Sequence, residues 1–232
     1  MADDPRSRIA VALDVDDLVA AVRIAKEVKP YVGIAKVGLE LYSAVGPDAV
    51  SALLDLEFEV FADIKLHDIP TTVGRSASVF GALGVRFLNF HAAGGEVMLR
   101  AGVEGLLSGA ERAGLPTPVP LAVTVLTSDA DAPAEVLRDR AGLAAKAGCG
   151  GVVCAAADIA AIRSVDPSLV CVTPGIRPTG VEQHDQGRAA TPTAAIGAGA
   201  DVLVVGRAIT AADDRAAAAR AVHQEVAAAL GA

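Results

Sequence analysis

Five charged residues stand at or just beyond the ends of apolar stretches, where they could do acid-base or electrostatic chemistry. IAVALD ends in Asp14, and VGIAK reaches Lys36. VFADIK ends with Asp63 and Lys65, and Asp68 follows three residues later. Because side chains two residues apart lie on one face of an extended chain, Asp63 and Lys65 are expected to touch.

This grouping indicates a site more strongly than any one member does, since a single charge at a strand end is as easily a solvated surface charge. Carboxylates and ammonium groups at neighbouring strand ends are costly to desolvate unless they neutralise one another, and such clusters often mark functional sites. The pattern DxKxxD is short, and its position after an apolar strand, together with Lys36, is what gives it weight.

A second group of residues could hold a phosphate. Gly206 and Arg207 follow the last apolar stretch directly before a helix, where backbone N–H groups and a guanidinium can bind an anion. A glycine turn with a solvated arginine explains this segment equally well. Residues 173–190 show neither helical nor strand periodicity, and a loop of this kind is usually functional. We expect it to close over a phosphate, using Arg177, Gln186 and Arg188.

The elements that must position these residues alternate between apolar strand-like stretches and Ala-rich helical ones, which is typical of repeated βα units. Eight strands are predicted, at Ile9–Asp14, Gly33–Val37, Glu59–Ile64, Arg86–Phe90, Val119–Val125, Gly151–Cys154, Leu169–Val172 and Asp201–Val205. Helix starts are indicated at Asp16, Pro47, Pro70 and Pro192. Residues 211–230 are acidic first and Ala-rich afterwards, which predicts a closing helix.

Eight such units in 232 residues predict one domain over residues 1–232, a (β/α)8 TIM barrel. An open doubly wound sheet shares the alternation, but eight units exceed its usual number and no GxGxxG follows the first strand. In a barrel the chemistry lies at the C-terminal ends of the strands, where the charged residues above stand. Asp68, past the third strand, can point away from its own barrel.

Composition limits the partners and the location. A net charge of −8 opposes nucleic-acid binding, which needs a basic surface, but leaves room for a small anionic ligand. No apolar run is long enough to cross a bilayer, and MADDPRSR is unlike a secretory signal, so a cytoplasmic protein is expected. The three cysteines, Cys149, Cys154 and Cys171, are expected to be reduced core residues.

The segments ADIKLHDIPTTV, LTS at residues 126–128, TPGIRPTG, DQGR and VVGRAIT, in this order, resemble the orotidine 5'-phosphate decarboxylase family. The resemblance runs from about Ala12 to Thr210. It implies conversion of orotidine 5'-phosphate to uridine 5'-phosphate, the last step of de novo pyrimidine nucleotide synthesis, without a metal or other cofactor. It also implies a homodimer.

The resemblance assigns roles to individual residues. Lys65 is implied to deliver a proton to C6 of the pyrimidine, with Lys36, Asp63 and Asp68 completing an alternating charged array. Asp68 and Thr72 are implied to reach across the dimer interface. The remaining implied substrate-binding positions are Asp14 and Lys36 for the ribose, Thr127 and Ser128 near the base, and Arg177, Gln186, Gly206 and Arg207 for the phosphate.

Departures from the family pattern, at Thr71, Phe90 and Asp129, replace no charged catalytic position and are expected to alter only the fine shape of the pocket. His91, in HAAGG, is interpreted as a structural hydrogen-bonding residue rather than an acid or base.

Two other functions remain open. One is a Mg2+-dependent sugar-phosphate decarboxylase or aldolase of the same barrel group, which resembles this chain in the DxKxxD strand. Such relatives carry an acidic metal ligand where Lys36 stands, and a cation there would repel a metal. The other is a phosphate-binding barrel without catalytic activity, against which the intact charged array argues.

Overall fold

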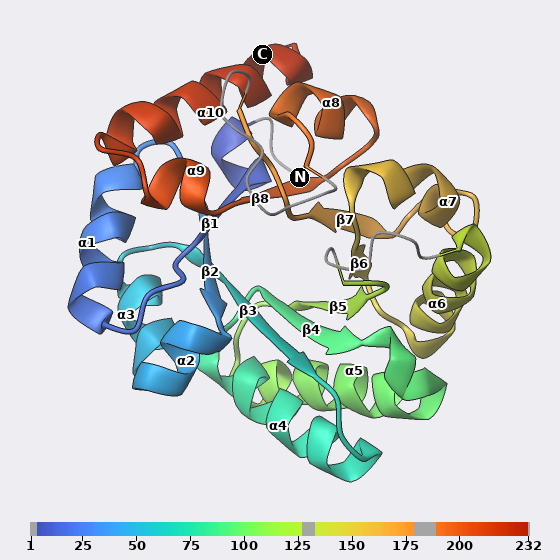
Figure 1. Cartoon of the computed structure of the whole chain (residues 1–232). Coiled ribbons are helices and arrows are strands. Elements are labelled where there is room, and N and C mark those ends of the chain that lie inside the picture. The colour runs from blue at the N-terminus through green and yellow to red at the C-terminus, as the bar shows by residue number, and fades with distance from the viewer. Residues whose placement is uncertain (1–3, 127–132, 179–188, 232) are drawn as a thin grey trace.

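Eight parallel strands close into a barrel in sequence order, with helices around the outside (Figure 1). The structure is a computed structural model that describes residues 4–126, 133–178 and 189–231. The strands are β1 (Ile9–Ala12), β2 (Ile34–Gly38), β3 (Glu59–Leu66), β4 (Phe87–His91), β5 (Val119–Val123), β6 (Gly151–Val153), β7 (Val170–Thr173) and β8 (Val202–Val205). The predicted (β/α)8 fold is confirmed, and the predicted strand ends differ from the observed ones by at most two residues.

Helices follow the strands around the barrel. Their bounds are α1 (Leu18–Val28), α2 (Leu39–Val45), α3 (Asp48–Asp55), α4 (Pro70–Leu83), α5 (Gly95–Arg112), α6 (Ala134–Ala147), α7 (Ile159–Arg163), α8 (Pro192–Gly197), α9 (Arg207–Thr210) and α10 (Arg215–Leu230). Three short 3-10 turns complete the described elements, at Pro5–Arg8, Ala92–Gly94 and Ala156–Asp158.

The helix starts show how local sequence sets the boundaries. Pro70 and Pro192 occupy the first helical position of α4 and α8, where the missing N–H of proline has no cost. The start predicted at Asp16 is one residue early, because the Asp17 side chain accepts a 2.8 Å hydrogen bond from the Ala20 N–H and caps α1. In the same way Asp214 caps α10, so that helix begins after the acidic residues.

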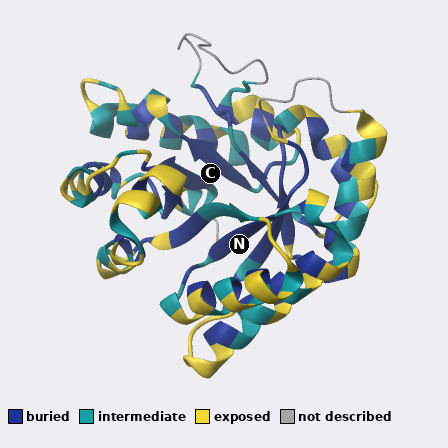
Figure 2. Cartoon of the chain, turned by 60° about the horizontal axis from the view of Figure 1, so that its bottom comes forward, coloured by how far each residue is buried: buried dark blue, intermediate teal, exposed yellow. Residues whose placement is uncertain are grey.

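The core has two layers, one inside the barrel and one between the strands and the helices. Figure 2 shows the strands buried at the centre and the exposed residues on the outer surface of the helices. Phe61 and Phe87 fill the interior with their rings edge to face, and centroids 6.1 Å apart. The three cysteines are buried and free, as predicted. Among the described residues, no helix is long and apolar enough to span a bilayer.

Helices α4 and α5 approach each other closely because glycines face each other between them. A Cβ on Gly105 would lie 2.1 Å from the Gly74 carbonyl oxygen, and one on Gly81 would lie 2.1 Å from that of Leu106. No larger residue fits at these positions without moving a backbone. The contact holds α4 against α5, so that its first turn stays beside the C-terminal end of β3.

Candidate active site

The C-terminal part of β3 is bulged. Pairing with β4 is regular as far as Ala62 and Leu88 and resumes at Leu66 and Phe90. Three residues of β3, numbers 63–65, therefore lie opposite the single residue Asn89. Lys65 within this bulge has a φ of +53°, in the left-handed region that lysine seldom adopts.

The bulge brings the Lys65 ammonium to 2.7 Å from Asp63 Oδ1. The contact expected between these two side chains is therefore present. The reason given for it, an extended chain, is wrong, because the backbone at Lys65 is left-handed rather than extended.

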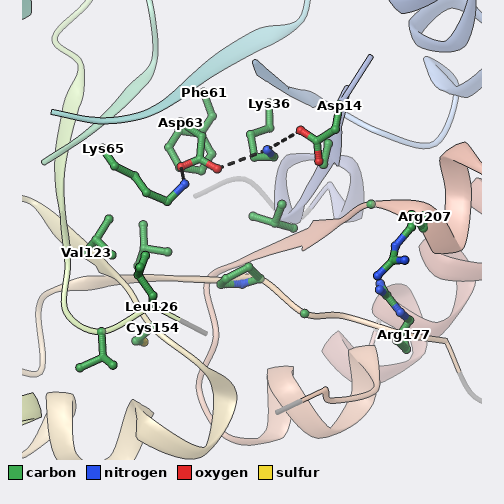
Figure 3. Close-up of a pocket in the computed structure, with 17 residues that line it drawn as sticks. Asp14, Lys36, Phe61, Asp63, Lys65, Val123, Leu126, Cys154, Arg177 and Arg207 are labelled. Carbon is green, nitrogen blue, oxygen red and sulfur yellow. Dashed lines mark hydrogen bonds and ion pairs between the residues drawn. The ribbon is translucent and has the colours of Figure 1, made fainter. Parts of the chain in front are cut away.

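Four of the predicted residues form a continuous chain of alternating charges at the strand ends (Figure 3). Lys36 Nζ lies 3.0 Å from Asp14 Oδ1 and 3.2 Å from Asp63 Oδ2, and Lys65 continues the chain on the other side of Asp63. Lys36 is only 7% exposed, and its ammonium group is paired with both of these carboxylates.

Asp63 is held ionised by its surroundings. Burial alone would raise the pKa of its carboxyl group. The positive charges of Lys36 and Lys65, with hydrogen bonds from Lys65 and Asn89, outweigh this effect and leave the pKa below its ordinary value. The carboxylate therefore stays charged at neutral pH and forms an ion pair with each lysine.

Two arginines stand at the opposite side of the same pocket. Figure 3 shows the guanidinium groups of Arg177 and Arg207 pointing toward each other. Arg177 is 7% exposed and donates to its neighbour's carbonyl at Ile176, over 3.0 Å. Burial and the charge of Arg207 lower the Arg177 pKa. Two facing cations favour an anion between them, and because α9 has only four residues, we attribute this to the side chains rather than to a helix terminus.

Between these charged ends the pocket wall is apolar. Phe61, Val123, Val153 and Val204 from the barrel interior line it together with Leu126. Gly206 and Cys154 also line the pocket. A ligand with a phosphate at one end, a flat ring against the apolar wall and a reacting atom at the lysine side would match this distribution of charge.

Some predicted site residues lie elsewhere. Asp68 and Thr72 are exposed and do not line this pocket; Asp68 Oδ1 accepts a 2.6 Å hydrogen bond from the Ile69 N–H. Thr71 is also exposed and lines a shallow groove between α4 and α5. Thr127, Ser128, Gln186 and Asp129 fall outside the described residues.

Two sequence interpretations on β4 need correction. His91 was expected to be a hydrogen-bonding residue, but its Nδ1 is buried and has no hydrogen-bond partner in the described part of the chain. Its ring packs against His67, with centroids 5.5 Å apart, and burial with neighbouring positive charge lowers its pKa. Phe90 was expected to affect the pocket, yet it packs outside the barrel over Gly102, where a Cβ would meet its ring at 2.5 Å.

Asn89 is a functional candidate that the sequence reasoning missed. It is fully buried, its Nδ2 donates to Asp63 Oδ1 over 2.7 Å, and its Oδ1 accepts from the Lys65 N–H over 2.7 Å. The available signal was a carboxamide within the otherwise apolar stretch FLNF, since a buried polar side chain must find partners.

Comparisons with known proteins agree with this arrangement. The family described as "Orotidine 5'-phosphate decarboxylase / HUMPS family" matches residues 7–222. A protein of Moorella thermoacetica named orotidine 5'-phosphate decarboxylase is 44% identical over 236 residues, covering 95% of this chain and 92% of its own length. One from an Anaeromyxobacter species with the same name is 47% identical over 229 residues, covering 94% and 97%.

Solved structures point the same way. The crystal structure of orotidine 5'-phosphate decarboxylase from Lactobacillus acidophilus matches with a TM-score of 0.82 and 34% identity, over 95% of this chain and 99% of that one. In both sequence and fold, this chain therefore matches orotidine 5'-phosphate decarboxylases over nearly its whole length. The resemblance seen in the short motifs is confirmed. The chain belongs to the orotidine 5'-phosphate decarboxylase / HUMPS family.

Proposed function

We propose that this protein decarboxylates orotidine 5'-phosphate to uridine 5'-phosphate, the last step of de novo pyrimidine nucleotide synthesis. The observation that carries the proposal is the charge chain Asp14, Lys36, Asp63 and Lys65, centred on the buried Lys36, which shares one pocket with two facing arginines. Relatives that bear this enzyme name match the chain over nearly its full length.

The distribution of charge suggests how the substrate would lie. Arg177 and Arg207 would bind the phosphate, with Gly206 beside them. Gln186, outside the described residues, is a further phosphate ligand that the family resemblance implies. Asp14 and Lys36 would contact the ribose hydroxyls. The pyrimidine would lie against the apolar wall, so that its C6 faces Lys65. The family resemblance implies further contacts near the base from Thr127 and Ser128, which lie outside the described residues. Phosphate contacts far from C6 would supply binding energy that is used in the transition state.

The reaction needs charge stabilisation at one carbon. When the bond between C6 and the carboxylate breaks, CO2 leaves and its electron pair stays on C6, with no adjacent π system to accept it. The Lys65 ammonium would stabilise this carbanion and transfer a proton to it, forming the C6–H bond of the product. Lys65 would then regain its proton from water. A preorganised donor of this kind in a dry site is typically worth about 3 to 4 kcal/mol.

We propose that the site is completed in a homodimer, in which Asp68 of the partner subunit joins the charged array and Thr72 of the partner subunit contacts the ribose. Both residues are exposed, at the end of β3 and in the first turn of α4, outside the pocket of their own barrel. From these positions they are available to a second copy of the chain. The cytoplasmic location expected from the sequence stays a prediction.

We expect no metal or other cofactor to take part. In this chain the Lys36 ammonium lies between the carboxylates of Asp14 and Asp63, at 3.0 and 3.2 Å, in the place where a divalent cation would need those oxygens. This position disfavours the Mg2+-dependent sugar-phosphate decarboxylase or aldolase.

The test is a direct assay that follows the loss of orotidylate absorbance by the purified protein, with and without excess EDTA. We expect turnover that EDTA leaves unchanged. Turnover that stops with EDTA and returns with Mg2+ would contradict the expectation that no metal takes part. No turnover by protein that still binds uridine 5'-phosphate would support the non-catalytic phosphate-binding barrel.

A further inference from the structure

The bulge in β3 leaves the backbone around Lys65 without its regular partner on β4. Only Asn89 stands opposite residues 63–65, so the ladder of backbone hydrogen bonds between the two strands is interrupted there. The side chain of Asn89 takes over part of this pairing, because its Oδ1 accepts the Lys65 N–H over 2.7 Å. Lys65 is thereby held at the left-handed φ of +53° that directs its side chain.

The other end of the same carboxamide fixes the Asp63 carboxylate. Asp63 Oδ1 accepts hydrogen bonds from Asn89 Nδ2 and from Lys65 Nζ, each over 2.7 Å. Asp63 Oδ2 faces Lys36 Nζ at 3.2 Å. The donor on Asn89 therefore sets the rotation of the carboxylate, with one oxygen toward each lysine.

We propose that Asn89 is a positioning residue, which aligns the backbone of Lys65 and the carboxylate of Asp63 for the decarboxylation proposed above. The inference rests on that proposed function, and it goes beyond it by assigning a role to a residue that does not line the pocket. Asn89 is fully buried, and both ends of its carboxamide are used within the charged array. A merely structural asparagine would have no reason to bridge two members of that array.

The charged surroundings of Asp63 predict how the pH dependence responds. The cations that face it are Lys36 from β2 and Lys65 from β3, and Asp14, two residues after β1, pairs with Lys36 from the other side. On β4 the nearest titratable group along the chain is His91, two residues after Asn89. The Asn89 hydrogen bond is one of the contributions that lower the Asp63 pKa. Its removal should therefore raise that pKa, and activity should be lost at a higher pH as the solution is acidified.

The experiment compares two variants with a matched control. Asn89→Leu removes both hydrogen bonds and keeps the branched shape with the same number of side-chain heavy atoms, whereas Asn89→Asp keeps an acceptor for the Lys65 N–H and replaces the donor by a second carboxylate. The control is Thr124→Val on the segment after β5, where a fully buried side chain also loses one hydrogen bond, to the Val153 carbonyl oxygen, without touching the array.

For Asn89→Leu we expect kcat to fall about 100-fold, the cost typical of a small displacement of reacting groups. The dissociation constant for uridine 5'-phosphate should stay within about two-fold, because the phosphate contacts are intact. The acid limb of kcat/KM should move to higher pH in both Asn89 variants, and further in Asn89→Asp, where a second carboxylate faces Asp63. Thr124→Val should match the wild type in all three measurements.

The outcomes separate this inference from the proposed function. If the wild type turns over and Asn89→Leu keeps its kcat and pH profile, the positioning role is wrong and the function stands. If the wild type has no turnover, the function is wrong, and the positioning role is read from carboxyl 13C NMR titration of Asp63 instead. A raised Asp63 pKa in the Asn89 variants but not in Thr124→Val supports the inference, and an unchanged one overturns it. If Asn89→Leu does not fold, Asn89→Asp, which is nearly isosteric with the wild type, can be used for both the kinetic measurement and the NMR titration.

Discussion

Lys65 reaches Asp63 across 2.7 Å from a backbone in the left-handed region, with a φ of +53°. The strain of that conformation, typically about 1 to 3 kcal/mol for a residue other than glycine, is tolerated because neighbouring contacts hold it in place. Such strain often marks functional sites, and here it lies at the residue proposed to transfer the proton.

Loss of the Arg207 guanidinium should weaken phosphate binding more than the chemical step. For Arg207→Ala we expect KM for orotidine 5'-phosphate to rise about 10- to 100-fold, since a charge-assisted hydrogen bond is worth about 1.5 to 3 kcal/mol. Steady-state kinetics measures this. Arg220→Ala, which removes an exposed arginine from α10, controls for the change in net charge and should match the wild type. Unchanged kinetics in Arg207→Ala would count against the phosphate site.

Asp63 should contribute to stability in a pH-dependent way. Its pKa in the folded protein is below the ordinary value of 3.8, so its contribution is fully present above that value and is lost as the pH falls through the folded pKa. For Asp63→Asn we expect a loss of about 3 kcal/mol in the free energy of unfolding at pH 7, because Lys36 is left buried without one of its carboxylates.

Urea denaturation at several pH values measures this difference. The difference in the free energy of unfolding between the wild type and Asp63→Asn should become smaller as the pH falls below about 4. Asp213→Asn, at an exposed position before α10, is the control and should show no gap at any pH. A gap for Asp63→Asn that stays constant from pH 7 to pH 3 would contradict the account of its charge.

The proposed homodimer leads to a quantitative prediction for mixed subunits. Lys65→Ala and Asp68→Ala proteins should each be inactive alone. If Asp68 acts across the interface, a dimer of one subunit of each kind has one site in which both residues are intact. Refolding an equal mixture gives about half mixed dimers, and so about a quarter of wild-type activity. Activity that does not return on mixing would place Asp68 in its own barrel's site, and activity of Asp68→Ala alone would place it outside any site.

The sequence predicted the barrel and most of the charged chain because both depend on local patterns. Alternating apolar and Ala-rich stretches specify βα units, and the barrel then places strand-end residues such as Asp14 and Lys36 at one rim. The bulge at residues 63–65 was not predictable in this way. A left-handed lysine is unfavourable locally, and its partner Asn89 lies on another strand, so only the tertiary structure shows why the conformation persists.

The sequence reasoning also did not predict which way the side chains on β4 point. Phe90 belongs to a motif that was associated with the pocket, yet its neighbour Asn89 turns toward the array while Phe90 packs against Gly102 on the helix side. Alternation along a strand explains this once the register is known. The register between β3 and β4 shifts at the bulge, which no single-strand pattern reveals.

The central claim is that Lys65 supplies the charge and the proton at C6, and it is tested most directly by Lys65→Ala. Turnover of orotidine 5'-phosphate and binding of uridine 5'-phosphate should be measured on the same preparation, with Thr124→Val as the folded control. The account predicts that turnover falls below detection while the product nucleotide binds within a few-fold of the wild-type affinity. Retained turnover in Lys65→Ala would contradict it.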